Sequence, residues 1–233
     1  MAVTPKTDEA FLREVDEEVR RERIAELARR YGRIAIIGLV VALLLLAGYL
    51  FWRHTREQDA ARQSEQLQAA FDKLGASDRD GAARDLKALA GSDRAVVRAV
   101  ARMAAADLAL QKDDVKGGAA QFDAIAGDDA MPQPYRDLAT VRSVAARFDQ
   151  LPPQQVIARL SPYAVAGKPW FGSAGEMVAI AHLRMGHRDQ AGKLFAEIAK
   201  DDGVPPSIRQ RAVQMAGATG VDAVAQVEDS KTR

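Results

Sequence analysis

The pattern of hydrophobic and polar positions separates one long apolar run from the rest of the chain. Residues 34–52, IAIIGLVVALLLLAGYLFW, include no charged side chain over 19 positions. As an α-helix they would extend roughly 28 Å, close to the thickness of a bilayer core. Tyr49 and Trp52 stand at one end, where aromatic rings favour the headgroup layer. The pattern predicts a single transmembrane helix over residues 34–52.

The alternatives to an anchor are a buried helix of a soluble core and a cleaved signal peptide. Buried helices rarely run this long without a polar residue. The run also exceeds the apolar region of a signal peptide, and 33 residues precede it. No small-residue cleavage site follows it promptly, because the chain continues directly into Arg53, His54 and Arg56. We therefore expect an uncleaved anchor in contact with the lipid bilayer.

Arginines flank this anchor unevenly. Seven lie between residues 13 and 33, and three lie in the twenty residues after Trp52. Because basic residues are retained on the cytoplasmic side, the segment 1–33 is predicted to be cytoplasmic and the rest to lie across the membrane. Residues 7–31 carry apolar positions at mostly helical spacings, which indicates an amphipathic helix. It is either a solvated helix whose arginines set topology or a helix that binds a partner at the membrane surface.

A helical pattern recurs beyond the anchor about every 36 residues. It places a small residue, a large apolar residue four positions later and another three positions after that, all on one helix face. A further large apolar residue stands eight positions before the small one. The four sets are Leu74, Ala82, Leu86 and Leu89; Leu110, Gly118, Phe122 and Ile125; Phe148, Val156, Leu160 and Tyr163; and Leu183, Ala191, Phe195 and Ile198.

This spacing predicts an all-α domain of about four helical hairpins over residues 53–216, similar to tetratricopeptide repeats. The first helix is expected near residues 57–74, with continuity into the anchor helix as one option, and a capping helix is expected over 207–216. Gly186 suits an interhelical turn, whereas Asp113 and Leu151 stand at its place in earlier repeats. A polar, disordered tail is expected over 217–233. An ordinary helical bundle is the alternative, but it would not readily explain four aligned triplets.

The composition of the chain excludes several classes of function and of binding site. The chain has 33 basic and 32 acidic residues, a net charge of +1, which argues against a nucleic-acid binder. It has no cysteine, so disulfides, thiolate metal sites and cysteine nucleophiles are excluded and the redox compartment is left undetermined. Only 6% of residues are aromatic, and much of the apolar content is alanine, which favours closely packed helices.

No arrangement of polar residues indicates catalysis, a cofactor, a metal site or a small-molecule substrate. His54 adjoins the membrane, where a solvated or headgroup-facing role is expected. His182 and His187 are five positions apart, which does not fit a pair of metal ligands four apart on one helix face. Paired aspartates at 113–114, 128–129 and 201–202 lie between predicted helices and suit turns and helix caps. The chain is predicted not to be an enzyme.

The first helices of the repeats carry the candidate binding residues. In a helical solenoid these helices line a concave surface that can bind extended peptides or helices. Core packing is the other interpretation of each apolar member of the set. The predicted partner-binding groove comprises Met103, Leu138, Val141, Ile180 and Arg184, with Met185 beside them.

Taken together, the chain resembles the YfgM-type family, whose members include the ancillary subunit of the SecYEG translocon in Gram-negative bacteria. The resemblance rests on the run FLREVDEEVRRERIAELARRYG (11–32), the anchor, and the repeats, of which 172–206 is the best formed. It implies an inner-membrane protein with a periplasmic repeat domain. The implied partners are the SecYEG translocon, a membrane-anchored prolyl-isomerase-type chaperone and unfolded client polypeptides. A scaffold for envelope assembly or cell division would use the same architecture and remains the alternative.

Overall fold

The computed structural model describes the backbone of residues 6–222, and side chains at residues 30, 33 and 34 and from 36 to 222. All regular structure in this part of the chain is helical, and the chain divides into two compact units between Arg62 and Gln63, within the first helix. The predicted all-α class is confirmed for the described residues. Side chains of the predicted amphipathic segment before residue 30 lie outside the description.

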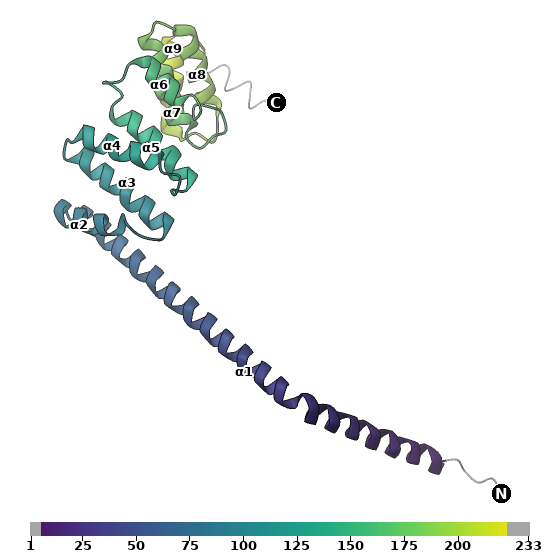
Figure 1. Cartoon of the computed structure of the whole chain (residues 1–233). Helices are drawn as coiled ribbons and strands as arrows, with labels where there is room; N and C mark the ends of the chain where they lie inside the picture. The colour runs from purple at the N-terminus through teal and green to yellow at the C-terminus, as the bar shows by residue number, and fades with distance from the viewer. Residues whose placement is uncertain (1–5, 223–233) are drawn as a thin grey trace. The chain divides into compact units, whose positions relative to one another are not determined.

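Helix α1 (Lys6–Gly75) is 70 residues long and carries the apolar run (Figure 1). The expected helix at 57–74 is therefore continuous with the anchor helix. Of the described helices, α1 is the one long and apolar enough to cross a membrane, and none of its most apolar window is buried by protein. Leu45 and Phe51, for example, are 70% and 71% exposed. Such a surface is stable in lipid and unfavourable in water, which fits a single-pass membrane protein.

The second unit is a succession of helical hairpins. The end of α1 pairs with α2 (Arg79–Leu89), and three further pairs and a final helix follow (Figure 1). The pairs are α3 (Ala95–Gln111) with α4 (Val115–Ala126), α5 (Gln133–Ala146) with α6 (Pro153–Leu160), and α7 (Phe171–Arg184) with α8 (Arg188–Lys200). The final helix, α9 (Pro206–Ala218), packs on α8. This is the predicted tetratricopeptide-like arrangement, with its capping helix.

The recurrent apolar triplets form the cores of these hairpins. At the second position of the triplet, Leu86, Phe122, Leu160 and Phe195 are all 0% exposed. The small positions are buried as well, including Val156, which is the one large residue among them. At the third position Tyr163 is only half-buried, whereas its three counterparts are buried. The repeat register inferred from sequence is therefore the register of the core.

Three of the interhelical turns share one backbone geometry. Ser77, Asp113 and Gly186 take left-handed φ values of 65°, 62° and 79° at equivalent places. After each of them, an amide donates to the carbonyl five residues back, which closes the preceding helix: Asp78 to Lys73, Asp114 to Ala109 and His187 to His182, at 2.9–3.0 Å. Asp113 thus adopts the same turn conformation as Gly186, since aspartate tolerates the left-handed region better than most residues. The third turn, with Leu151 and Pro152, takes no such conformation.

The end of the domain extends further than expected. Helix α9 continues to Ala218, beyond residue 217 where a disordered tail was expected, and Val221 packs against the core of α7 to α9. Gly192 on α8 leaves the space for this segment, because a Cβ there would lie 2.4 Å from Thr219 Oγ1 and 2.7 Å from Val221 Cγ2. The part of the predicted tail from 223 to 233 lies outside the described residues.

Candidate functional site

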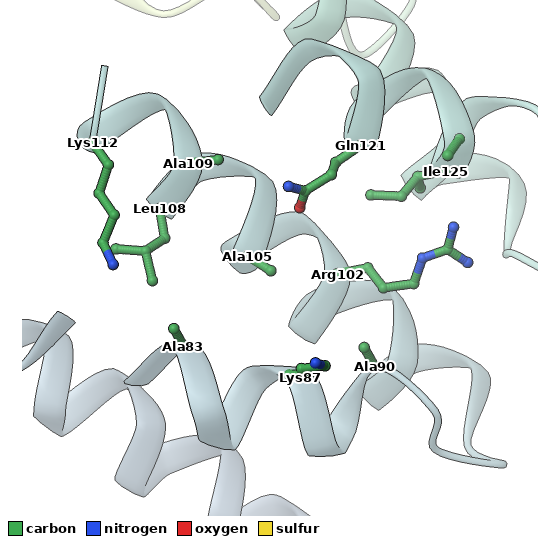
Figure 2. A pocket seen from close by; sticks show the side chains of 11 residues that line it. Ala83, Lys87, Ala90, Arg102, Ala105, Leu108, Ala109, Lys112, Gln121 and Ile125 are labelled. Carbon is green, nitrogen blue, oxygen red and sulfur yellow. The ribbon is translucent and has the colours of Figure 1, made fainter. Parts of the chain in front are cut away.

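An open groove of about 430 Å³ lies between α2 and α4, with α3 as its floor. Five of its eleven lining residues are alanines. Figure 2 shows Ala83 and Lys87 on α2, and Ala90 directly after it, facing Ala105, Leu108 and Ala109 on α3, with Gln121 and Ile125 on α4. Ala124 and Arg102 and Lys112 complete the lining. Because alanine ends at Cβ, the helices pack closely beneath the groove while the space above it is left unfilled.

The charged residues that line the groove are all cations. Arg102 pairs with Asp128 at 2.7 Å, and Lys112 pairs with Asp80 at 2.7 Å, so the charge of each is partly compensated by a carboxylate outside the lining. The hydrogen bonds from these cations lower the pKa values of Asp128 and Asp80. Lys87 makes no ion pair with any residue whose side chain the structure describes. The groove therefore has an apolar floor and, on its α2 wall, an exposed lysine without an ion pair among the described side chains.

The next junction, between α4 and α6 over α5, is filled at equivalent positions by a polar cluster. Moving by one repeat, Lys87, Ala105, Ala109 and Gln121 are replaced by Asp123, Ser143, Arg147 and Arg159. These four residues, here called the Asp123 cluster, bond to one another. Asp123 accepts from Ser143 Oγ at 2.5 Å, from Arg159 Nη2 at 2.6 Å and, through its other oxygen, from Arg147 Nη2 at 2.6 Å.

The environment of Asp123 favours its charged form. Burial alone would raise the pKa of this carboxyl, but the hydrogen bonds from Ser143 and Arg159 and the charges of Arg159 and Arg147 outweigh it. The pKa of Asp123 is lowered as a result. Ser143 is fully buried and its hydroxyl is satisfied by Asp123 and Arg147. This junction is thus closed by the protein's own charges.

The third junction, between α6 and α8 over α7, is closed differently again. Val178 and Leu194 stand there at the places of Ser143 and Arg159, and they pack with Ile157 in one apolar cluster. Successive junctions are therefore hollow, ionic and apolar in turn. Of these three junctions, the first has an open groove that another molecule could enter.

The groove predicted from sequence lies elsewhere. Met103 and Val141 are 8% and 5% exposed and belong to hydrophobic cores, and Leu138 and Ile180 are half-buried against cores. Arg184 pairs with Asp149 at 2.5 Å and lies 4.3 Å from the centre of the Phe148 ring. The burial of the first two favours core packing, the interpretation held alongside binding. Whether these residues contact a partner stays a prediction.

The two surfaces use opposite sides of α3. A helix turns once in about 3.6 residues, so Ala105 and Ala109 point away from the side that carries Met103. The sequence signal for the groove was a row of alanines at positions that the next repeat fills with Ser143 and Arg147. Sequence reasoning missed it because it searched for large apolar side chains.

The histidines show no sign of a metal centre. The rings of His182 and His187 lie 5.8 Å apart and are tilted, and among the described residues no three His, Cys, Asp or Glu side chains gather in a way that could hold an ion. Burial, and then the charge of His187, lower the pKa of His182. His54 is exposed and forms a hydrogen bond of 2.9 Å with Gln58.

Comparison with known proteins gives one match. The profile of the family described as "Tetratricopeptide repeat-like domain" matches residues 28–215. No curated protein and no solved structure matches the chain. The matched range includes the apolar part of α1 and the helices from α2 to most of α9.

Proposed function

The chain belongs to the tetratricopeptide repeat-like domain family, and from this premise we propose that it is a membrane-tethered protein-interaction subunit of the secretion machinery. In this proposal α1 crosses the inner membrane with residues 1–33 in the cytoplasm, and the repeat domain works in the periplasm. Its partners are the SecYEG translocon, a membrane-anchored chaperone of the prolyl-isomerase type, and polypeptides emerging from the translocon. The protein holds its partners and does no chemistry on them.

The observation that carries this proposal is the combination of a lipid-length apolar helix with a hairpin-repeat domain that has an unfilled groove. Helical repeats are typically binding scaffolds, because their extended surfaces present many side chains to another chain. The apolar side chains of α1, such as Leu45, have no protein cover. A tether of this kind raises the effective concentration of the domain near other membrane proteins, so modest contacts suffice. The resemblance in the run 11–32 points to the translocon among possible membrane partners.

Crosslinking in intact membranes followed by mass spectrometry tests the proposal. The expected result is crosslinking of the repeat domain to translocon subunits and to a membrane-anchored chaperone. Division or envelope-assembly proteins without translocon subunits would instead support the scaffold alternative and contradict the proposed role.

Orientation is tested separately by protease treatment of inside-out inner-membrane vesicles. With the repeat domain in the periplasm, residues 53–233 would face the vesicle interior and be protected, while residues 1–33 would be digested. Digestion of the repeat domain in sealed vesicles would show the opposite orientation and exclude a periplasmic role.

A further inference from the structure

We propose that the groove over α3 binds a segment of a partner protein in which a large apolar side chain is flanked by carboxylates. The inference rests on the proposed function for the statement that the ligand is a protein, and it adds the place and the chemistry of recognition. The hollow is open, and its lining includes the alanines Ala83, Ala90, Ala105, Ala109 and Ala124. An aliphatic or aromatic side chain laid across these methyl groups would bury apolar surface on both molecules.

The positive charges of the lining are the reason for expecting carboxylates on the partner segment. The lining includes Lys87, Arg102 and Lys112 and no acidic residue. Arg102 and Lys112 already contact Asp128 and Asp80, whereas Lys87 has no counterion among the described side chains. A basic partner segment would meet repulsion from the walls of the groove. An acidic one could pair with Lys87 and gain further attraction from the two paired cations.

The neighbouring junction shows the same chemistry made within the chain. There a carboxylate, Asp123, reaches between two helices and is held by Arg147 and Arg159. At the first junction the corresponding residue of α2 is Lys87, so the carboxylate is absent and the charge on α2 is reversed. A partner carboxylate beside Lys87 would complete an ion pair there, with the partner's apolar side chain in the space that Ser143 and Arg147 occupy one repeat later.

The test uses the full-length protein in its native membrane with a photo-crosslinking amino acid, p-benzoyl-phenylalanine, in place of Gln121 at the groove wall. A matched probe replaces Ala158 on α6, which is exposed and does not line the groove. Mass spectrometry identifies the crosslinked peptide and its sequence. The expected product from position 121 is a peptide of another protein with an apolar residue between aspartates or glutamates, and position 158 should give much less of it.

Charge reversal provides the second readout. Lys87→Glu should lower the yield of this product about three- to tenfold, because an attraction becomes a repulsion at a partly solvated site. Lys193→Glu makes the same change of charge on α8, at an exposed lysine for which the described side chains provide no ion pair, and should leave the yield unchanged.

The outcomes separate this inference from the proposed function. Crosslinks to proteins from position 158 or other surfaces, but not from 121, would overturn the groove and leave the interaction role in place. A peptide without acidic residues, a peptide of a second copy of this chain, a lipid adduct, or equal effects of the two lysine changes would also overturn it. Failure of every position to crosslink to any protein would overturn the groove and the interaction role together.

Discussion

The first and second junctions of the repeat domain occupy the same place in the repeat. They differ in whether side chains of the chain itself fill the space between the helices. Between α2 and α4, alanines and Lys87 leave a groove, while between α4 and α6 the Asp123 cluster closes the space with its own hydrogen bonds. Helix α4 is a wall of both. Beneath each junction the core positions are alike, since Leu86, Phe122 and Leu160 are all fully buried.

The comparison separates residues that build the repeat from residues that decide its surface. The apolar triplet is repeated in all four hairpins, because each hairpin must bury one face of its second helix. The positions above the core are free to change without loss of that packing. Whether a junction is closed or left open is decided there by four side chains. Changes in the core should therefore affect stability greatly, and changes above it should affect binding more than stability.

The largest expected effect is from Phe122→Ala. Phe122 is 0% exposed in the core of α3, α4 and α5, and removal of its ring should leave a cavity. We expect the free energy of unfolding to fall by about 3–5 kcal/mol. Denaturant unfolding of the full-length protein in detergent micelles, followed by circular dichroism, measures the change. Phe195→Ala is the matched change in the fourth hairpin and should have a similar effect, and a loss below 1 kcal/mol in either would contradict the shared core.

That core is the part of the molecule that could be predicted from sequence. The helix pairs, their order and the buried positions Leu86, Phe122, Leu160 and Phe195 follow from periodicity alone, because burial of one helix face imposes a spacing on large residues. The left-handed turn at Asp113 could not be predicted so directly. Glycine marks that conformation at Gly186, but aspartate and serine can adopt it when the hydrogen bonds of the turn are formed.

The groove could not be predicted from the sequence, for a different physical reason. A hollow is made by small residues on three helices that approach one another only in the folded state. The row of alanines that includes Ala105 and Ala109 is equally typical of a tight contact between helices, so the sequence alone does not tell which of the two it forms. The Asp123 cluster was missed likewise, since Asp123 and Arg159 are 36 residues apart in sequence and their contact depends on the packing of α4 against α5 and of α5 against α6. Met103 and Val141 were predicted as surface candidates because size and spacing do not tell which face of a helix is covered.

A second prediction concerns the close approach of α3 and α4, which sets one wall of the groove. A Cβ on Gly118 would lie 2.5 Å from Leu110 Cδ2 and 3.0 Å from the carbonyl oxygen of Ala106. Gly118→Val, which introduces the residue found at this place in the third repeat, should lower the free energy of unfolding by about 1–3 kcal/mol.

The control for this change is Gly217→Ala on α9, where nothing lies within 4 Å of the added Cβ. That change should leave stability equal or raise it by about 0.5–1 kcal/mol. Thermal unfolding followed by circular dichroism distinguishes the two. If Gly118→Val were as stable as the unchanged protein, the close contact of α3 and α4 would not be a constraint on this wall.

The third prediction removes the anion from the second junction. Asp123→Asn would leave Arg147 and Arg159 near each other without their shared carboxylate, and we expect a loss of about 1–2 kcal/mol at neutral pH, because the site is partly solvated. Asp93→Asn, at an exposed aspartate whose hydrogen bond to Gln63 is 3.4 Å long, should change stability by less than about 0.5 kcal/mol.

The pH dependence sharpens this test. Because the pKa of Asp123 is lower in the folded protein than in the unfolded chain, its contribution to stability is present above the unfolded carboxyl's pKa of about 3.9 and is lost as the pH falls through the folded value. Melting temperature should therefore fall more steeply below about pH 5 in the unchanged protein than in Asp123→Asn. Parallel curves for the two proteins would show that the cluster adds no stability through this charge.

The last prediction converts the open junction into the closed one. Lys87→Asp, Ala105→Ser, Ala109→Arg and Gln121→Arg together would place the chemistry of the Asp123 cluster in the groove. The new hydrogen bonds should roughly offset the entropy of the ordered side chains, so the expected change in the free energy of unfolding is small, about 0.5–1 kcal/mol in either direction. Ala105→Ser and Ala109→Arg without the aspartate are the matched control, because they leave the added arginine without its acceptor.

If the groove is the binding surface, the fourfold variant should lose the crosslinked partner although its melting temperature hardly changes. A variant that folds with the cluster formed and still holds its partner would show that the difference between the two junctions has no bearing on binding.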